Sequence, residues 1–253
     1  MPQRLCSAAA ALLLSGSLAA CGGSQSPPPT KEVCAASPAL KFFAPSRRSQ
    51  CGATADFTPI NSYRGPLADA QLREDAVALI NGDCTGTLIA AANGPVVLTA
   101  GHCVGLGDED LLEFNYEDNP DGDPLVTTGT VIEASLNPDY ALLRLDQLPA
   151  VTPTPLTSRP TDFLAVIQHP RARPKVIAEG TLAGVCDDRV YYGDLDTLDG
   201  SSGAGVLTGT GYLLAVHTDG TCAADGSGTN SGWSAASIVA ASQYLQDADI
   251  APR

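Results

Sequence analysis

From about residue 75 onward, short apolar runs alternate with strong turn signals. Residues 76–80 are closed by Asn81-Gly82-Asp83, and residues 85–89 are separated from residues 96–99 by Asn93-Gly94-Pro95. Runs of this length are typical of strands, and Asn-Gly pairs are typical of the tight turns between them. The pattern predicts an antiparallel β-sheet protein with few helices.

The same alternation of short apolar runs and turn signals continues toward the C-terminus. Residues 151–155, Val-Thr-Pro-Thr-Pro, have the composition of an extended connector and therefore mark a boundary between two halves. Apolar residues at helical spacing predict one helix over residues 234–247, packed on the β structure. The further predicted strands are residues 126–134, 140–145, 163–167, 175–182, 190–192, 205–208 and 212–217.

The N-terminal region has the composition of an export signal. Arg4 precedes an apolar run that is too short to span a bilayer, so residues 1–20 are predicted to be a signal peptide. Leu18-Ala19-Ala20-Cys21 resembles the box of bacterial lipoproteins, which implies cleavage before Cys21 and lipidation of that residue. We therefore expect an exported, membrane-anchored protein at the outer membrane or cell surface. Ordinary cleavage without a lipid, giving a periplasmic or secreted protein, is the alternative.

Residues 21–50 are predicted to be a proline-rich tether, because Pro27-Pro28-Pro29 stiffens the chain and few of its residues can form a core. The pair Arg47-Arg48 is either a processing site or a solvated pair of charges. Residues 51–150 and 151–253 are then expected to form the two halves of the folded protein.

The charge and the cysteines limit the function. The 253 residues carry a net charge of −14, which argues against nucleic acid as a partner. Two of the eight cysteines, Cys6 and Cys21, belong to the signal and the anchor, and no Cys-x-x-Cys pair indicates zinc. The other six can form three disulfides in an oxidising compartment. They are Cys34, Cys51, Cys84, Cys103, Cys186 and Cys222.

Residues 105–124 are predicted to be a long acidic loop. The carboxylates of residues 118–123 invite comparison with a calcium site, but their spacing does not match a helix–loop–helix calcium loop. We predict no metal ion and no cofactor, with calcium binding by this loop as the alternative.

The stretch from Asp199 to Gly205 contains two hydroxyls among three glycines. A serine becomes a useful nucleophile only when a base removes its proton and donors stabilise the oxyanion. Of the three histidines, His102 follows an apolar strand and precedes Cys103. A bond from Cys103 to Cys84 would close a loop of about 20 residues, stabilise by roughly 3 kcal/mol and hold the imidazole in place.

Three motifs together resemble the chymotrypsin-like serine proteases. Residues 99–103, Thr-Ala-Gly-His-Cys, resemble Thr-Ala-Ala-His-Cys; residues 139–145 resemble Asp-Ile-Ala-Leu-Leu; and residues 200–205 resemble Gly-Asp-Ser-Gly-Gly-Pro. They occur in that family's order of His, Asp and Ser. The resemblance covers about residues 75–245 and implies an all-β fold. That fold has two antiparallel six-stranded β-barrels and a C-terminal helix, with the site between the barrels.

The resemblance also implies roles. Ser202 aligns with the nucleophile, His102 with the general base and Asp139 with the residue that orients the imidazole, while the N–H groups of Gly200 and Ser202 would form the oxyanion hole. We therefore predict an exported serine endopeptidase that hydrolyses polypeptides through an acyl-enzyme and works as a monomer. An inactive surface-binding protein on the same scaffold is the alternative, and hydrolysis of esters is a third hypothesis.

Departures from the motif point to one branch. Trypsin-like enzymes have aspartate at the position of Ser201, where it pairs with a newly freed N-terminus, whereas bacterial glutamyl- and lysyl-endopeptidase-like enzymes have a small neutral residue. In the glutamyl enzymes a histidine like His217 and a threonine like Thr197 help to bind an acidic side chain before the scissile bond. Asp219 would instead favour Lys or Arg. An acidic preference is the leading hypothesis, with basic and small or apolar preferences left open.

Cys34, Cys51, Cys186 and Cys222 allow three pairings. Cys186–Cys222 would brace the chain on both sides of Ser202. The resemblance to lysyl-endopeptidase-like enzymes implies Cys51–Cys222 instead.

Overall fold

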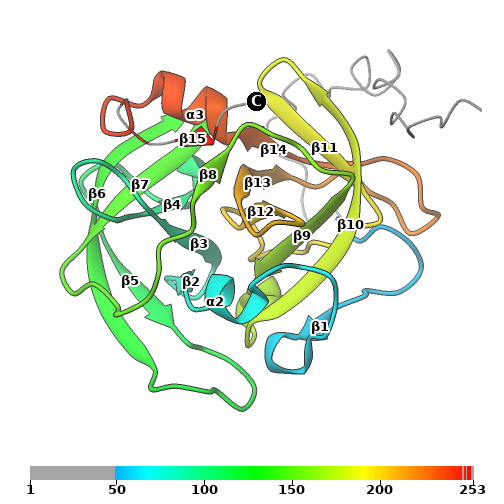
Figure 1. The fold of residues 1–253 in the computed structure, drawn as a ribbon, viewed down its shortest axis with the longest axis horizontal. Coiled ribbons are helices and arrows are strands. Elements are labelled where there is room, and N and C mark those ends of the chain that lie inside the picture. The colour runs from blue at the N-terminus through cyan, green and yellow to red at the C-terminus, as the bar shows by residue number, and fades with distance from the viewer. Residues whose placement is uncertain (1–48, 247, 249, 252–253) are drawn as a thin grey trace, which may run out of the picture.

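The computed structural model describes residues 49–246, 248 and 250–251 (Figure 1). The predictions for the signal peptide, for Cys21 and Cys34 and for Arg47-Arg48 lie outside these residues, as does most of the predicted tether. Among the described residues, no helix is both long and apolar enough to cross a membrane.

The first barrel is a closed antiparallel sheet of six strands in the order β2-β3-β4-β7-β6-β5. Most of its inward positions are apolar, as the sequence pattern predicts. The strands are β2 (Val77–Ile80), β3 (Cys84–Ile89), β4 (Val96–Thr99), β5 (Glu109–Phe114), β6 (Leu125–Leu136) and β7 (Asp139–Leu145).

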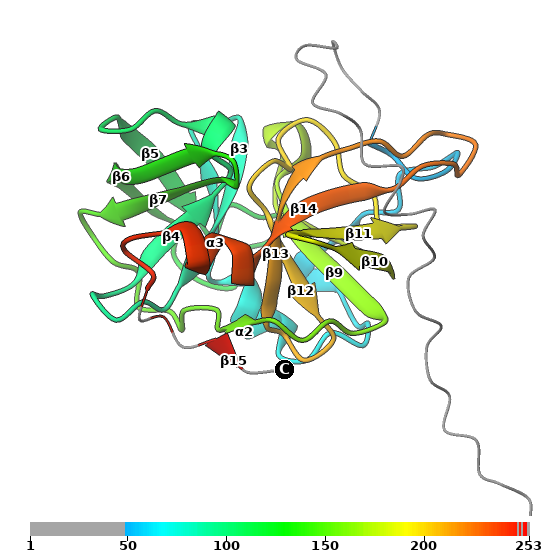
Figure 2. The same ribbon diagram turned by 90° about the horizontal axis from the view of Figure 1, so that it is seen from above.

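The second barrel also has six strands, because β12 pairs with both β9 and β13 and so closes the run β9-β10-β11-β14-β13. All pairings in this ring are antiparallel. The two barrels lie side by side, as Figure 2 shows. The strands are β9 (Phe163–Gln168), β10 (Val176–Cys186), β11 (Arg189–Gly193), β12 (Gly205–Thr208), β13 (Leu213–Asp219) and β14 (Asn230–Ser234). The predicted all-β fold with two six-stranded barrels is confirmed.

Three short strands extend the second sheet. β1 (Thr58–Pro59) pairs with β10, β8 (Leu156–Thr157) runs parallel to β13, and β15 (Ile250–Ala251) runs parallel to β8. The first described segment of the chain therefore lies against the second barrel before the chain enters the first one.

Two of the three hydrophobic clusters fill the barrels, and the third lies between them. This third cluster joins Leu98 and Tyr140 of the first barrel to Leu207 and Val216 of the second, with Ile238 of the C-terminal helix packed against it. Close packing of this kind resists sliding. The barrels are thus held at a fixed mutual position, which lets residues from both contribute to one site.

The C-terminal helix α3 (Ala235–Ala241) is confirmed but is shorter than predicted. Ser234 caps its start by accepting a hydrogen bond from Ser237 N at 3.1 Å. The predicted extension to residue 247 is wrong for residues 242–246, which are not helical. The Glu133 carboxylate draws the chain away from the helix axis, because it accepts bonds from Ser242 Oγ, Gln243 N and Tyr244 N.

Every predicted strand overlaps an observed one, but the barrel strands β5 and β14 and the short strands β1, β8 and β15 were not predicted. β5 lies inside the expected acidic loop, so that expectation is wrong for Glu109–Phe114. Its burial alternates along the strand, but one inward position is Asp110, whose carboxylate accepts a bond from Asn81 Nδ2. Because this inward residue is acidic, the sequence lacks the alternation of apolar and polar residues that predicts a strand. A single turn of helix, α2 (Ala70–Glu74), precedes β2.

Candidate active site

His102 lies just after the end of β4, in a 3-10 turn formed by Gly101–Cys103. A Cβ on Gly101 would lie 1.9 Å from the carbonyl oxygen of Ser135, so this close approach of two backbones requires glycine. A disulfide of 2.03 Å joins Cys103 to Cys84, the pair named from the sequence. The turn that carries the imidazole is thus fixed on both sides of His102.

Asp139 is the first residue of β7 and faces His102. His102 Nδ1 lies 2.7 Å from Asp139 Oδ2, and the His102 backbone N–H donates to Oδ1 at 3.0 Å. The hydrogen bond that the ring donates to the Asp139 carboxylate raises the pKa of His102 and outweighs the opposing effect of burial. Because Nδ1 is engaged, Nε2 is the ring nitrogen that remains for another reactant.

The loop that carries Ser202 comes from the second barrel and packs against the first. Gly203 has φ of 84°, and a Cβ there would lie 2.0 Å from Thr99 Oγ1 and 2.2 Å from the Thr85 carbonyl oxygen. Thr85 N donates to the Ser202 carbonyl at 2.9 Å, and Cys103 Sγ lies 3.9 Å from the same oxygen. Glycine at 203 thus lets the loop seat against the strand end that precedes His102.

Several N–H groups of this loop, those of Gly200 and Ser202 among them, have no hydrogen-bond partner among the described residues. Within the described part of the chain, the N–H groups of Gly200 and Ser202 donate to no other residue, and the Ser202 hydroxyl forms no hydrogen bond. Gly200 has φ of 92°, and its carbonyl accepts from Thr85 Oγ1 at 2.8 Å. Ser201 Oγ accepts from Leu198 N at 2.9 Å, so the hydroxyl of Ser201 is occupied within the loop while that of Ser202 is not.

His217, near the end of β13, is joined to the same loop. Gly203 N donates to the His217 carbonyl at 2.8 Å, and His217 N donates to the Ala204 carbonyl at 2.9 Å. The side chain is only 3 % exposed, and this burial lowers the pKa of His217 to about 4, so the ring is neutral at pH 7. His217 Nδ1 lies 2.6 Å from the hydroxyl of Tyr192.

The Tyr192 hydroxyl sets the tautomer of His217. Tyr192 is fully buried, and its hydroxyl has no partner among the described residues except His217 Nδ1. A buried hydroxyl donates where it can. Donation to Nδ1 leaves the proton of the neutral ring on Nε2. The ring also forms a hydrogen bond with the backbone of Ser231, which opposes the effect of burial on its pKa.

The other two predicted substrate-binding residues are held by neighbours. Thr197 is fully buried, and its hydroxyl accepts from Asn230 Nδ2 at 3.1 Å. Asp219 forms an ion pair with Arg189 and accepts from Thr218 Oγ1 at 2.8 Å. Burial opposes ionisation of Asp219, but Arg189 outweighs it and lowers the pKa. The cation therefore offsets the charge that would repel an acidic side chain.

One group of carboxylates among the described residues has the spacing for a metal ion. Ligand atoms of Glu74, Asp75 and Asp121 lie within 4.8 Å of one another. Lys175 already neutralises part of this region, with Nζ 2.7 Å from both Glu74 Oε2 and Glu117 Oε1. Burial raises the pKa of Glu74 to about 8. The group shares no residue with the His102–Asp139 pair.

Three side chains near the site carried no recognisable signal in the sequence. Tyr192 belongs to an apolar run that predicts only a strand, and Arg189 stands at the beginning of that strand. Asn230 follows a stretch of small and polar residues that is typical of a turn. Each acquires its partners only when the second barrel closes.

The model of the trypsin-like peptidase domain matches residues 84–216, whereas no curated protein matches the sequence. The fold is similar to that of a serine endoprotease from Yersinia pestis, with a TM-score of 0.55 and 14 % identity over 67 % of this chain and 62 % of that one. A serine protease of a human pathogenic astrovirus has a TM-score of 0.48 and 20 % identity over 64 % of this chain and 91 % of that one. At these identities the likeness concerns the fold.

Proposed function

Because this chain belongs to the trypsin-like peptidase domain family, we propose that it is an exported serine endopeptidase that uses Ser202, His102 and Asp139 as a triad. The observation that carries the proposal is the His102–Asp139 pair, with 2.7 Å between Nδ1 and Oδ2. The loop of Ser202 packs close to this pair, because Gly203 lies against Thr99 at the end of β4. The absence of a hydrogen bond from Ser202 Oγ among the described residues is compatible with this role, since catalytic bonds often tighten only when substrate binds.

The proposed reaction begins when Ser202 Oγ attacks the carbonyl carbon of the scissile peptide bond. His102 Nε2 takes the hydroxyl proton, and Asp139 holds the ring in the Nδ1–H tautomer and offsets the charge of the imidazolium. The tetrahedral intermediate collapses as the imidazolium gives its proton to the departing amine. A water molecule, activated by the same imidazole, then hydrolyses the acyl-enzyme and regenerates Ser202.

The oxyanion formed in both steps requires donors that are already in place. The unpaired N–H groups of Gly200 and Ser202 support that role, because they lie in one short loop on either side of Ser201. Loss of one such donor costs about 10²–10³ in rate in enzymes of this mechanism.

Labelling with an alkyl fluorophosphonate tests the proposal. The reagent should modify Ser202 in the wild-type protein, and the modification should be absent in Ser202→Ala and His102→Ala. Peptide mapping identifies the labelled residue. A wild-type protein that unfolds cooperatively but is not labelled would contradict the proposal and favour the surface-binding alternative.

The finer proposal is a preference for Glu or Asp before the scissile bond, in the manner of the glutamyl-endopeptidase-like branch. The neutral, Nε2-protonated ring of His217 supports it as a donor to a carboxylate, and the Arg189–Asp219 ion pair removes the main electrostatic objection. Peptides that differ only in that residue test the preference. Equal kcat/KM for Glu, Lys and Ala would exclude it.

Export and lipidation are proposed from the sequence alone. The residues before Cys21 have the order of a lipoprotein signal, and the six remaining cysteines suit an oxidising compartment. Fractionation of cells that make wild-type protein or Cys21→Ala tests both points. The wild type should sediment with membranes, and the variant should appear in the soluble exported fraction. Wild-type protein in the soluble fraction would contradict the lipid anchor.

A further inference from the structure

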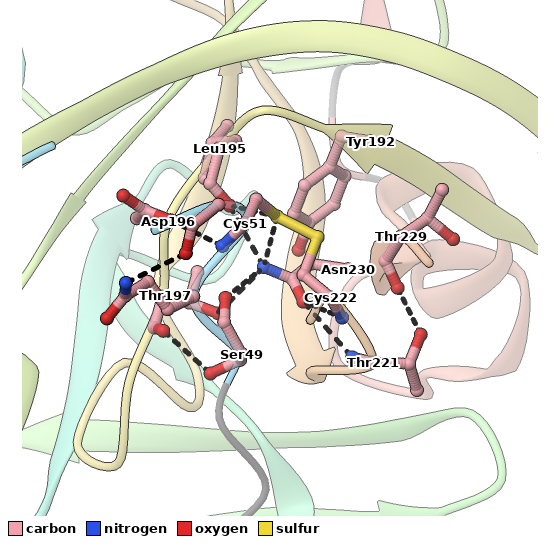
Figure 3. The surroundings of a disulfide bond; sticks show 12 residues. Ser49, Cys51, Tyr192, Leu195, Asp196, Thr197, Thr221, Cys222, Thr229 and Asn230 are labelled. Atoms are coloured by element: carbon pink, nitrogen blue, oxygen red, sulfur yellow. Dashed lines mark hydrogen bonds between the residues drawn. A yellow bond between two sulfur atoms is a disulfide. The ribbon is translucent and has the colours of Figure 1, made fainter. Parts of the chain in front are cut away.

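The side chain of Asn230 is the centre of a buried hydrogen-bond network at the start of β14 (Figure 3). Its Nδ2 donates to the Ser49 carbonyl at 2.7 Å, the Leu195 carbonyl at 2.9 Å and Thr197 Oγ1 at 3.1 Å. Its Oδ1 accepts from the backbone N–H groups of Thr221 at 3.1 Å and Cys222 at 3.3 Å. Asn230 is fully buried, and no atom of its amide lacks a partner.

This network joins three other segments to β14. The first is the start of the described chain at Ser49, which also donates its hydroxyl to the Thr197 carbonyl at 2.7 Å. The second is the run from Leu195 to Thr197, and the third is the loop at Thr221 and Cys222. An amide that bridges so many groups has no substitute among the other side chains, since only Asn and Gln combine two N–H donors with a carbonyl acceptor.

Other bonds bind the first segment to the same place. The Cys51–Cys222 disulfide links it covalently to the third segment. Both oxygens of Asp196 are used, one by Cys51 N at 2.6 Å and the other by Asp56 N at 2.5 Å. Residues 49–56 are therefore built into the second barrel, as Figure 3 shows for Ser49 and Cys51.

The second segment leads directly into the loop of Ser202. Thr197 N donates to the Ser49 carbonyl at 3.2 Å, and the next residue, Leu198, exchanges two hydrogen bonds with Ser201. Ser201 separates the N–H groups of Gly200 and Ser202, which have no partner among the described residues. A continuous run of bonded groups thus connects Asn230 to the donors that we assign to the oxyanion.

We propose that Asn230 is a positioning residue for catalysis, which couples the docked segment of residues 49–56 to the conformation of the Ser202 loop. This inference rests on the proposed function. In trypsin-like enzymes the residue before the nucleophile is an aspartate that pairs with a free N-terminus, whereas here Ser201 bonds within its own loop. The Asn230 amide, which is uncharged, connects the base of that loop to the backbone carbonyl of Ser49, whereas the aspartate of trypsin-like enzymes binds a terminal amine.

The test compares Asn230→Asp and Asn230→Ser with the wild-type protein. Asn230→Asp keeps the acceptor for Thr221 and Cys222 but loses every donor, and Asn230→Ser loses most of both. We expect kcat to fall at least tenfold with little change in KM, because the oxyanion donors act on the transition state. The second-order rate of alkyl fluorophosphonate labelling should fall in parallel, since that probe has no side chain to fill a specificity pocket.

Asn61→Ser is the matched control, because the Asn61 amide also bridges several acceptors, Glu117 Oε2 at 2.7 Å, the Asn119 carbonyl at 2.7 Å and the Asp118 carbonyl at 3.4 Å. It should lower the melting temperature without lowering kcat. If the Asn230 variants do not fold, Thr197→Val decides, since with little change of shape it removes only the two bonds of the Thr197 hydroxyl, with Asn230 Nδ2 at 3.1 Å and with the Ser49 carbonyl at 3.5 Å.

Wild-type labelling rates in a folded Asn230 variant, or in Thr197→Val where the Asn230 variants do not fold, would overturn the positioning role. Failure of the wild-type protein to label at all would overturn the proposed function instead.

Discussion

The two oxygens of the Asp139 carboxylate accept from two different groups of His102, the ring nitrogen Nδ1 and the backbone N–H. The carboxylate is thereby fixed relative to the turn, and the ring is fixed relative to the carboxylate. These two bonds fix the orientation of the imidazole ring before substrate binds. It also explains why the pKa of His102 lies above its usual value although the ring is partly buried.

Asp139→Asn should lower kcat/KM by about 10⁴, because the amide no longer favours the Nδ1–H tautomer. The wild-type enzyme should lose activity as the pH falls through a His102 pKa above 6.5, since the base must be neutral. The residual activity of Asp139→Asn should be lost at a lower pH, which a kcat/KM profile measures. Asp83 also raises that pKa but by less than Asp139 does, so it provides the control Asp83→Asn, whose profile should be nearly unchanged.

Gly203→Ala should abolish activity and destabilise the fold by about 3 kcal/mol or more. The backbone there is left-handed, with φ of 84°, and a Cβ would lie 2.0 Å from Thr99 Oγ1 and 2.2 Å from the Thr85 carbonyl oxygen. Gly193→Ala is the control, because a Cβ at that position meets no atom within 4 Å. Urea unfolding and fluorophosphonate labelling measure both variants. Wild-type activity in Gly203→Ala would mean that the loop can be seated another way.

Tyr192→Phe should change the substrate preference rather than the chemical step. The variant removes the donor to His217 Nδ1, so the proton of the neutral ring can move to that nitrogen and Nε2 can no longer donate. We expect KM for substrates with Glu before the scissile bond to rise about tenfold, the size of one lost hydrogen bond. Substrates with Ala at that position should be unaffected.

The control for this change is Tyr212→Phe, since the Tyr212 hydroxyl has no hydrogen bond with a described residue. An equal effect of Tyr192→Phe on Glu and Ala substrates would place His217 outside the specificity pocket.

His169→Asn should weaken the loss of stability in mild acid. His169 is fully buried, and burial lowers its pKa to about 3, so the unfolded chain binds a proton between pH 3 and 6.5 that the folded protein does not. Wild-type stability from this residue is therefore present above pH 6.5 and is lost as the pH falls. Between pH 7 and pH 5 the loss is about 2 kcal/mol, which the variant should not show.

Urea unfolding of both proteins at the two pH values measures this difference. Glu74, whose pKa is raised to about 8, acts in the opposite direction, but it is present in both proteins and cancels in the comparison. The same pH dependence in wild type and variant would show that His169 is protonated without cost.

The fold could be predicted because its strands and turns carry local signals. Asn81-Gly82, the apolar run before Thr99 and the glycines at 200 and 203 report on backbone conformation within a few residues. β5 was missed because Asp110 occupies an inward position and finds its partner, Asn81, in the turn that follows β2. The helix was extended too far because the Glu133 side chain, distant in sequence, decides where it ends.

The contacts around His217 could not be predicted for a different reason. Tyr192 and His217 lie on β11 and β13, which are separated by β14, where Tyr192 pairs with Asn230 and His217 pairs with Gly232. A Cβ on Gly232 would lie 2.2 Å from the Val216 carbonyl oxygen. The contact between Tyr192 and His217 forms only when the barrel closes and depends on the length of both side chains. The pattern of residues along the sequence predicts neither. Asn230 is similar, because its partners come from three separate segments.

The placement of residues 49–56 on the second barrel also bears on how the protein is made. Cys51 and Cys222 are 171 positions apart, so the early segment leaves the ribosome long before its seat has been synthesised. Until the second barrel has been synthesised, residues 49–56 have no docking site, and the first barrel can fold without them. The second barrel is therefore completed by a segment that is synthesised early, and any C-terminal truncation that removes Cys222 leaves residues 49–56 without their docking site.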